Sequence, residues 1–392
     1  MKWPLMGETI TWGDRIKMAS FVMTEKRFTY GEKVKKFEQE WSNWLGVKHS
    51  LFVSSGSTAN TLLLSSVKEL YKLKDGDKVL VPACTWVTNI SPVFQLGLQP
   101  IFCDINLQNY SFDLDDAKQI AKKHKDIKAI FVTHLLGFPA DNHKLQKLFP
   151  NALIIDDICE SHGCKDVEGE KYGSKSLGST FSFYFGHHMS TIEGGMVSTN
   201  NADLYDLMRM KRSHGMARES TKQKEYAEKY SHIEPSFLFM TDGYNFRNHE
   251  ICAVLGSSQL KRLDSMIEQR RHNYEQYVKI INKYPTLFYP HTYEDGNSSF
   301  CFPFVCKSEK IARIMKEAFK HYNIEYRPIV SGNLLTQPFL VNRGYKIETN
   351  KHKTNAEILH SQGVYIGNNH FVGNKHMKLL EQAMEDVYDD IC

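Results

Sequence analysis

The sequence has no long apolar run, no closely paired cysteines and no strong excess of one charge. Its 392 residues contain nothing close to the roughly 18 apolar residues of a membrane span, and the start, MKWPLMGETITWGD, lacks the apolar core of a secretory signal. We therefore expect a cytoplasmic protein. The formal net charge of +4 is small for this length, so nucleic acid is not an expected partner.

The eight cysteines include no C-x-x-C pair, which does not fit a zinc ribbon or a disulfide framework. They stand at positions 84, 103, 159, 164, 252, 301, 306 and 392. The nearest pairs, Cys159/Cys164 and Cys301/Cys306, do not form the cysteine pattern of an iron–sulfur centre. We expect most of these cysteines to be buried free thiols.

Compact apolar runs alternate with segments of helical length, which predicts an α/β fold with a mainly parallel sheet. The expected strands are LFV (51–53), KVLVPA (78–83), PIFCDI (100–105), IKAIFV (127–132), ALIID (152–156), TFSFYF (180–185) and GMVST (195–199). Amphipathic spacing predicts a helix over 31–46, and a long helix from about Glu250 leads to weaker strand signals, FCFPFV and IEYRPIV. The length predicts two domains: a large one over 1–250, and the linking helix with a small C-terminal domain over 251–392.

Ligands of such sheets gather at the carboxyl ends of the strands. After the first expected strand, SSGSTAN places Gly56 and Ser57 at the start of a helix, where N–H groups and the helix dipole favour a phosphate; a simple Ser/Thr helix cap is the alternative. Asp157 follows ALIID. A carboxylate there needs a cation, such as a protonated ring nitrogen, or several donors, unless it lies in an exposed loop or caps a helix.

Two adjacent histidines occupy the turn after TFSFYF. Ser182 can supply a hydroxyl near the end of that strand, and His187 and His188 follow it. A metal site would combine them with Glu193 or His162, but no H-E-x-x-H or comparable ligand spacing is present. The histidine pair by itself does not define a function.

Taken in order, these turns resemble those of the DegT/StrS-type nucleotide-sugar aminotransferases, pyridoxal phosphate enzymes with the aspartate-aminotransferase fold (fold type I). The resemblance covers nearly the whole chain. Its segments are SSGSTANTLLL, VPACTWVTNISPVFQLGLQPIFCDIN, DDICESHG and GYNFRNHEICAVLGSSQLKRLD. The implied fold is α/β, with a mainly parallel central sheet and a smaller C-terminal α+β domain.

The resemblance also implies a set of cofactor contacts. Asp157 would hold the pyridine nitrogen, and Trp86 would stack on the ring. Gly56, Ser57 and Ser182 would bind the phosphate.

Four further residues receive roles from the resemblance. Asn245 would reach the same phosphate from a neighbouring subunit, which implies a homodimer with shared active sites. Glu160 would tune the cofactor or merely cap a helix. His214 and Arg218, in RSHGMAR, are candidate substrate contacts, with an exposed pair at a helix-to-loop junction as the alternative.

One position departs from the family pattern. Where the family has the lysine that binds the cofactor covalently, this sequence has His187, and no lysine occurs between Lys175 and Lys211. Imidazole can move protons near neutral pH but cannot form that covalent bond. We therefore expect pyridoxal or pyridoxamine phosphate to be bound non-covalently, a pattern similar to the 3-dehydratases of the family.

The expected reaction removes the C3 hydroxyl from a nucleotide-linked 4-keto-6-deoxy-hexose, foremost GDP-4-keto-6-deoxy-D-mannose. L-Glutamate would regenerate the amine form of the cofactor. The product would be a 4-keto-3,6-dideoxy sugar for a surface polysaccharide, on the way to colitose of a lipopolysaccharide O-antigen. The alternatives are a dehydratase for a CDP-linked sugar, a nucleotide-sugar aminotransferase and a catalytically silent family member. No single residue identifies the base of the nucleotide.

Overall fold

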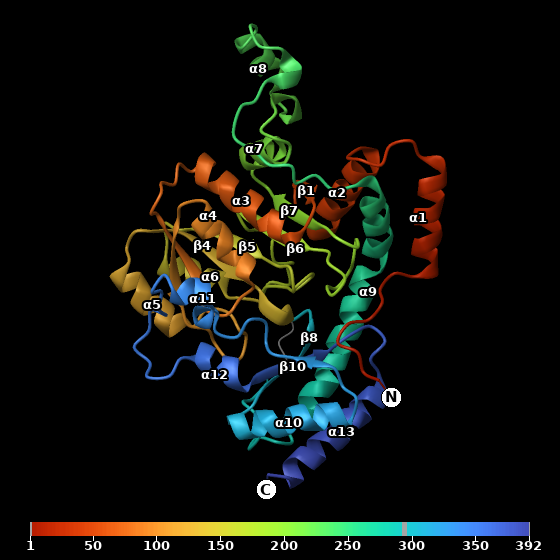
Figure 1. The fold of residues 1–392 in the computed structure, drawn as a ribbon, viewed down its shortest axis with the longest axis vertical. Helices are drawn as coiled ribbons and strands as arrows, with labels where there is room; N and C mark the ends of the chain where they lie inside the picture. The colour runs from red at the N-terminus through yellow and green to blue at the C-terminus, as the bar shows by residue number, and fades with distance from the viewer. Residues whose placement is uncertain (1, 292–295, 392) are drawn as a thin grey trace.

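The computed structural model describes residues 2–291 and 296–391, and Figure 1 shows its ribbon. Cys392 lies outside the described residues. The other seven cysteines are free thiols, and all of them except Cys159 are buried. No helix in the described ranges is long and apolar enough to cross a membrane.

A seven-stranded sheet with the order β1-β7-β6-β5-β4-β2-β3 forms the centre of the larger part of the molecule. The strands are β1 (His49–Val53), β2 (Lys78–Pro82), β3 (Gln99–Cys103), β4 (Ile127–Thr133), β5 (Leu153–Asp157), β6 (Gly178–Ser182) and β7 (Gly195–Thr199). β7 is antiparallel to β1 and β6, and the other neighbouring pairs are parallel. The predicted sheet is confirmed, although β6 ends at Ser182 and not at 185, and Asp157 is the last residue of β5.

Helices cover the sheet and connect it to the C-terminal part (Figure 1). They are α1 (Trp12–Thr24), α2 (Glu32–Leu45), α3 (Gly56–Leu70), α4 (Ser91–Gln95), α5 (Leu114–Lys123), α6 (Asn142–Leu148), α7 (Ala202–Arg212), α8 (Gln223–Lys229), α9 (Glu250–Ile281), α10 (Glu309–His321), α11 (Pro338–Val341), α12 (Asn355–Gln362) and α13 (Asn374–Asp389). The helix predicted over 31–46 is α2, which buries Val34, Phe37 and Trp41 against β1 and α9. The predicted long helix is α9.

A second, three-stranded antiparallel sheet forms the C-terminal part, with the order β8-β10-β9. Its strands are β8 (Cys301–Val305), β9 (Tyr326–Arg327) and β10 (Gly363–Gly367). The strand β10 was not predicted from the sequence, because GVYIG is short and has a glycine at each end. The start of the chain also lies here, since the indole N–H of Trp3 donates to the carbonyl of Gly367 at 2.9 Å. The domain boundary near residue 250 stays a prediction.

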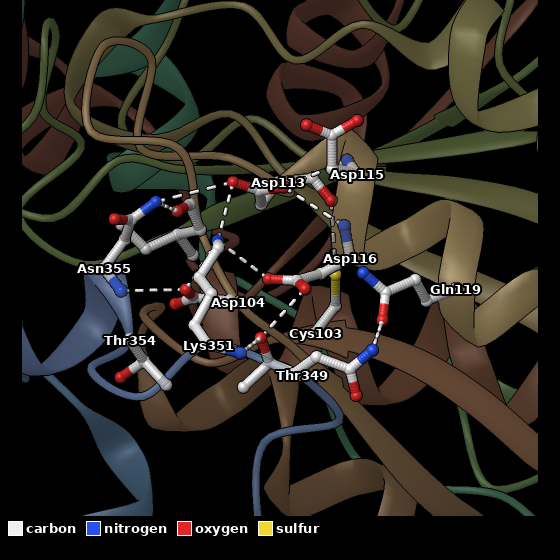
Figure 2. A network of polar contacts seen from close by, with 12 residues as sticks. Cys103, Asp104, Asp113, Asp115, Asp116, Gln119, Thr349, Lys351, Thr354 and Asn355 are labelled. Atoms are coloured by element: carbon white, nitrogen blue, oxygen red, sulfur yellow. Dashed lines mark hydrogen bonds and ion pairs between the residues drawn. The ribbon is translucent and has the colours of Figure 1, made fainter.

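A buried network of ion pairs joins the segment before α12 to the end of β3, as Figure 2 shows. Lys351 Nζ lies 3.0 Å from Asp104 Oδ2, 2.9 Å from Asp113 Oδ2 and 2.8 Å from Asp116 Oδ2. The carboxylate of Asp104 also accepts the backbone N–H groups of the first two residues of α12. One lysine thus holds the C-terminal part against the large sheet.

Candidate active site

The ends of β5 and β6 lie next to the start of α3, as the sequence predicts. A Cβ atom added to Gly56 would lie 2.6 Å from Ser182 Cβ and 3.0 Å from Cys159 Sγ. Only a glycine at this position lets the first turn of α3 approach the ends of β5 and β6 so closely. The phosphate turn, the aspartate and the serine predicted from sequence therefore belong to one site.

Three donors hold the carboxylate of Asp157, which is buried at the end of β5. Oδ2 accepts the side-chain amides of Asn60 at 2.8 Å and Asn89 at 3.0 Å, and Oδ1 accepts the N–H of Cys159 at 2.9 Å. Asn60 is itself fixed by Thr180 Oγ1, which donates to its side-chain oxygen at 2.6 Å. The carboxylate has a fixed orientation and still has lone pairs for a cationic partner.

Asn60 and Asn89 were not predicted from the sequence. Both are buried asparagines, on α3 and on the short 3-10 helix Val87–Asn89. A buried amide needs a partner, and this requirement is the one signal in the sequence that could have led to them. They act through Asp157, because their amide groups orient its carboxylate.

The first turn of α3 keeps free donors. Ser55 is the cap of this helix, because its hydroxyl accepts the N–H of Thr58 at 3.1 Å. The backbone N–H groups of Gly56 and Ser57 have no hydrogen-bond partner in the described parts of the chain. The cap predicted as an alternative is thus present at Ser55, and the two residues after it remain available to an anion.

Trp86 lies exposed at the mouth of this site. Its side chain is 56% exposed, and it follows β2 directly before the 3-10 helix that carries Asn89. The preceding residue, Thr85, is buried and hydrogen-bonded to Asn89 and Thr133 at 2.8 Å. A rigid support below an exposed indole ring suits stacking on a flat ligand.

The two adjacent histidines have different environments. His187 is partly exposed; its backbone N–H donates to the carbonyl of Tyr184 at 3.0 Å, and its Nδ1 is buried without a partner in the described residues. His188 is buried, with Nε2 at 3.0 Å from the carbonyl of Ser298 and Nδ1 at 3.3 Å from Nδ1 of His162. His188 thus anchors the turn in the core, whereas His187 remains free to react.

Burial sets the protonation states of His187 and Glu160. Burial, with a smaller effect from Arg270, lowers the pKa of His187 to about 4, so its imidazole is neutral at pH 7. Burial raises the pKa of Glu160 to about 7, although the N–H of Leu136, which donates to its Oε2 at 3.1 Å, acts in the opposite direction. Near neutral pH the chain therefore offers a neutral imidazole and a carboxyl that can donate a hydrogen bond.

The remaining predicted residues do not join this group within one chain. Asn245, His214 and Arg218 are exposed. In the chain, His214 and Arg218 lie between α7 and α8, and the segment around α8 projects from the body (Figure 1). His214 Nε2 is 3.5 Å from the guanidinium of Arg247, and Arg218 Nε is 3.9 Å from Glu219. Their roles stay predictions.

A mainly parallel sheet with these residues at its strand ends, joined by a long helix to a small antiparallel sheet, is the arrangement of the aspartate-aminotransferase-like enzymes. The chain belongs to the DegT/DnrJ/EryC1/StrS aminotransferase family, whose model matches residues 11–380.

Relatives support this assignment along almost the entire chain. GDP-4-keto-6-deoxy-D-mannose 3-dehydratase from Yersinia pseudotuberculosis is 34% identical over 381 residues, which cover 94% of this chain and 95% of the relative. The solved structure of the E. coli GDP-4-keto-6-deoxy-D-mannose-3-dehydratase with bound hydrated PLP is 30% identical and has a TM-score of 0.89, over 98% of this chain and 99% of that one. A GDP-4-keto-6-deoxymannose-3-dehydratase with a trapped PLP-glutamate geminal diamine is also 30% identical, with a TM-score of 0.87 over 97% of this chain and all of that one.

Four histidines with lowered pKa values, three of them buried, predict a loss of stability in mild acid. Burial lowers the pKa of His187 and His291 to about 4, and that of His162 and His188 well below 6.5. Below pH 6.5 the unfolded chain thus binds more protons than the folded one, so the free energy of unfolding falls as the pH falls from 6.5 towards 4. Each histidine contributes at most about 1.4 kcal/mol per pH unit in this window. Urea denaturation at several pH values measures this slope.

His291 provides the test of this explanation, because it is buried against Tyr277 of α9, in the core of the C-terminal part. The variant His291→Leu should have a smaller slope between pH 6.5 and 5, by about 1 kcal/mol per pH unit. An unchanged slope in this variant would show that other groups cause the loss of stability in acid.

Proposed function

We propose that this protein is a pyridoxal phosphate-dependent 3-dehydratase. It removes the C3 hydroxyl from GDP-4-keto-6-deoxy-D-mannose, with L-glutamate as amino donor, and yields a 4-keto-3,6-dideoxy sugar. The single observation that carries this proposal is His187: the site has the contacts for this cofactor, but a histidine stands at the position of the lysine.

The residues present fit the cofactor. The buried carboxylate of Asp157 can take the protonated ring nitrogen, and the free N–H groups of Gly56 and Ser57 can take the phosphate together with Ser182. The exposed indole of Trp86 can cover the ring. When bound, pyridoxal phosphate or its amine form supplies an electron sink for the reaction.

His187 is the acid and base of the proposed reaction. Its imidazole is neutral at pH 7, and its Nε2, unlike Nδ1, is not buried and has no partner among the described residues, so this nitrogen can accept a proton without first breaking a hydrogen bond. The contacts of His188 with Ser298 and His162 fix the turn and thereby the position of the ring. No lysine lies in this turn, so the cofactor is held by non-covalent contacts alone.

Glu160 completes the group of titratable residues at the cofactor. Its raised pKa, about 7, lets it donate a hydrogen bond to an oxygen of the cofactor near neutral pH. His187 and Glu160 have pKa values displaced in opposite directions, an arrangement that assigns the base to the histidine and a hydrogen-bond donor to the carboxyl.

The active form is proposed to be a cytoplasmic homodimer with shared sites. Asn245 would contribute to the phosphate site of the partner subunit, and His214 and Arg218 would contact the substrate. Support comes from the exposure of all three side chains and from the projection of the segment around α8 away from its own body (Figure 1).

The mass of the product tests the proposed reaction. The purified protein is incubated with pyridoxal phosphate, L-glutamate and GDP-4-keto-6-deoxy-D-mannose, and the sugar nucleotide is analysed by mass spectrometry. We expect loss of the mass of one oxygen atom, with release of 2-oxoglutarate and ammonia, because one water is eliminated from the sugar and two hydrogens that derive from the oxidation of glutamate are added to it. Addition of an amino group would instead make the protein an aminotransferase, and an unchanged sugar would contradict both reactions.

A further inference from the structure

Arg270, on α9, is a buried cation that forms no ion pair in the ranges that the structure describes. Its side chain is 2% exposed, and its Nε has no hydrogen-bond partner among the described residues. Arg212, which is also buried, pairs with Glu38 at 2.6 Å. Burial lowers the pKa of Arg270 to about 10, so the guanidinium is still charged at pH 7. An unpaired charge in the interior is costly, and its presence calls for a role beyond packing.

The guanidinium holds residues 298–300 in place. Its Nη1 donates to the carbonyl of Phe300 at 2.9 Å and to that of Asn368, which follows β10. The side-chain amide of Asn368 donates to the carbonyls of Arg270 at 2.9 Å and Ser299 at 3.1 Å. A neutral amide could donate to the same two carbonyls as Arg270, so these hydrogen bonds by themselves do not explain the charge.

Residues 298–300 contact the turn of His187 on one side. The carbonyl of Ser298 accepts the Nε2–H group of His188 at 3.0 Å. The ring of Phe300 has its centroid 5.8 Å from that of His187 and 5.9 Å from that of His188. A displacement of this segment would therefore displace the imidazole of His187.

On the other side, the same segment contacts the turn that holds Glu160. The N–H of Phe300 donates to the carbonyl of Leu136 at 3.2 Å, and the N–H of Ser298 donates to that of Gly137 at 2.8 Å. The N–H of Leu136 in turn donates to Oε2 of Glu160 at 3.1 Å. One buried segment thus lies between the two titratable residues of the site.

The charge of Arg270 acts on the histidine turn. It lowers the pKa of His187, after burial, and also that of His188. Three titratable side chains face His187 as well, from its own turn and from the segment after β5: Tyr184, His188 and His162. None of these three is a cation at pH 7, since burial lowers the pKa of both histidines well below 6.5.

We propose, on the basis of the proposed function, that Arg270 is a positioning residue of the reaction: it fixes residues 298–300 between His187 and Glu160, and its charge keeps the imidazole of His187 unprotonated. Only the neutral imidazole can take a proton from the reacting group. A guanidinium suits this role better than a lysine amine, because it does not lose its own proton when buried.

Titration of the histidines by NMR tests this assignment on the full chain. The protein is labelled with carbon-13 in the histidine rings, and the signal of His187 is identified by its absence in His187→Gln. In Arg270→Gln the amide still donates to the carbonyls, but the charge is gone. The ratio of protonated to neutral His187 at a given pH should then rise about tenfold, which corresponds to one pH unit. The acidic limb of the rate of product formation should move up by the same amount.

Arg271→Gln is the matched control. Arg271 is the next residue of α9 and also donates to carbonyls, from Nε to Asn297 at 2.7 Å and from Nη2 to Gly163 at 3.0 Å. Its loss should change the ratio at His187 by no more than about twofold. An unchanged ratio in Arg270→Gln would overturn the role of the charge. A wild type in which His187 titrates near pH 6.5 would overturn it without any variant, so the test does not depend on the folding of Arg270→Gln.

The outcome for Arg270 is separate from the outcome for the reaction. The titration of His187 needs neither cofactor nor turnover. A tenfold change at His187 in Arg270→Gln, together with an unchanged sugar in the mass assay, would contradict the dehydratase proposal alone. Dehydration of the sugar by the wild type, with an unaltered titration of His187 in Arg270→Gln, would contradict only the role of Arg270.

Discussion

Replacement of His187 by lysine is expected to abolish formation of the deoxygenated sugar and to leave the cofactor covalently attached to the protein. The lysine amine restores the group that the family uses for covalent attachment, at a turn whose other contacts remain. The acid and base of the proposed reaction is lost at the same time, and such groups typically contribute 10²- to 10⁴-fold to the rate. Product formation by mass spectrometry, and the intact protein mass after borohydride reduction, measure both effects.

His187→Gln is the matched control for this experiment, because it removes the base without supplying an amine. It should lose product formation to a similar extent but keep the cofactor removable by dialysis. A product yield in His187→Lys equal to that of the wild type would exclude His187 from the mechanism. Loss of product in both variants, with covalent cofactor only in the lysine variant, would establish both parts of its role.

The strands and the reactive turns could be predicted because local sequence determines them. Buried parallel strands are apolar along their whole length, and Gly56, Asp157 and His187 each follow such a run closely or end it. Their meeting follows from the geometry of a parallel sheet, in which the carboxyl ends of the strands lie on one edge. The resemblance then supplied the chemistry that connects them.

The groups that hold these residues could not be predicted in the same way, because they depend on contacts between distant segments. Asn60 lies 97 positions before Asp157, and Nε2 of His188 donates to the carbonyl of Ser298, 110 positions away. The resemblance placed His187 at the position of the lysine but gave His188 no role, and only the packing of His188 against His162 and Ser298 assigns it to the core. The strand β10 was missed for a similar reason: its position in the centre of the small sheet stabilises it, not its local sequence.

Lys351 joins the segment before α12 to the end of β3 and to α5, and its loss is expected to reduce stability strongly. Lys351→Met is expected to lower the free energy of unfolding by about 3 kcal/mol, because it leaves buried carboxylates without their cation. The side chains of Asp104 and Asp116 have exposed fractions of 0% and 1%, whereas that of Lys351 is 31% exposed, so water can replace only part of the lost interaction. Urea denaturation at pH 7.5 measures the loss.

Two comparisons distinguish unpaired charge from lost packing as the cause. Lys283→Met breaks a surface pair with Glu381, in which the lysine is 58% exposed, and should cost about 0 to 1 kcal/mol. Addition of Asp116→Asn to Lys351→Met removes one of the unpaired charges and should restore part of the lost stability. A double variant no more stable than Lys351→Met would show that the aliphatic chain of Lys351, and not its charge, holds the segment before α12 against the end of β3.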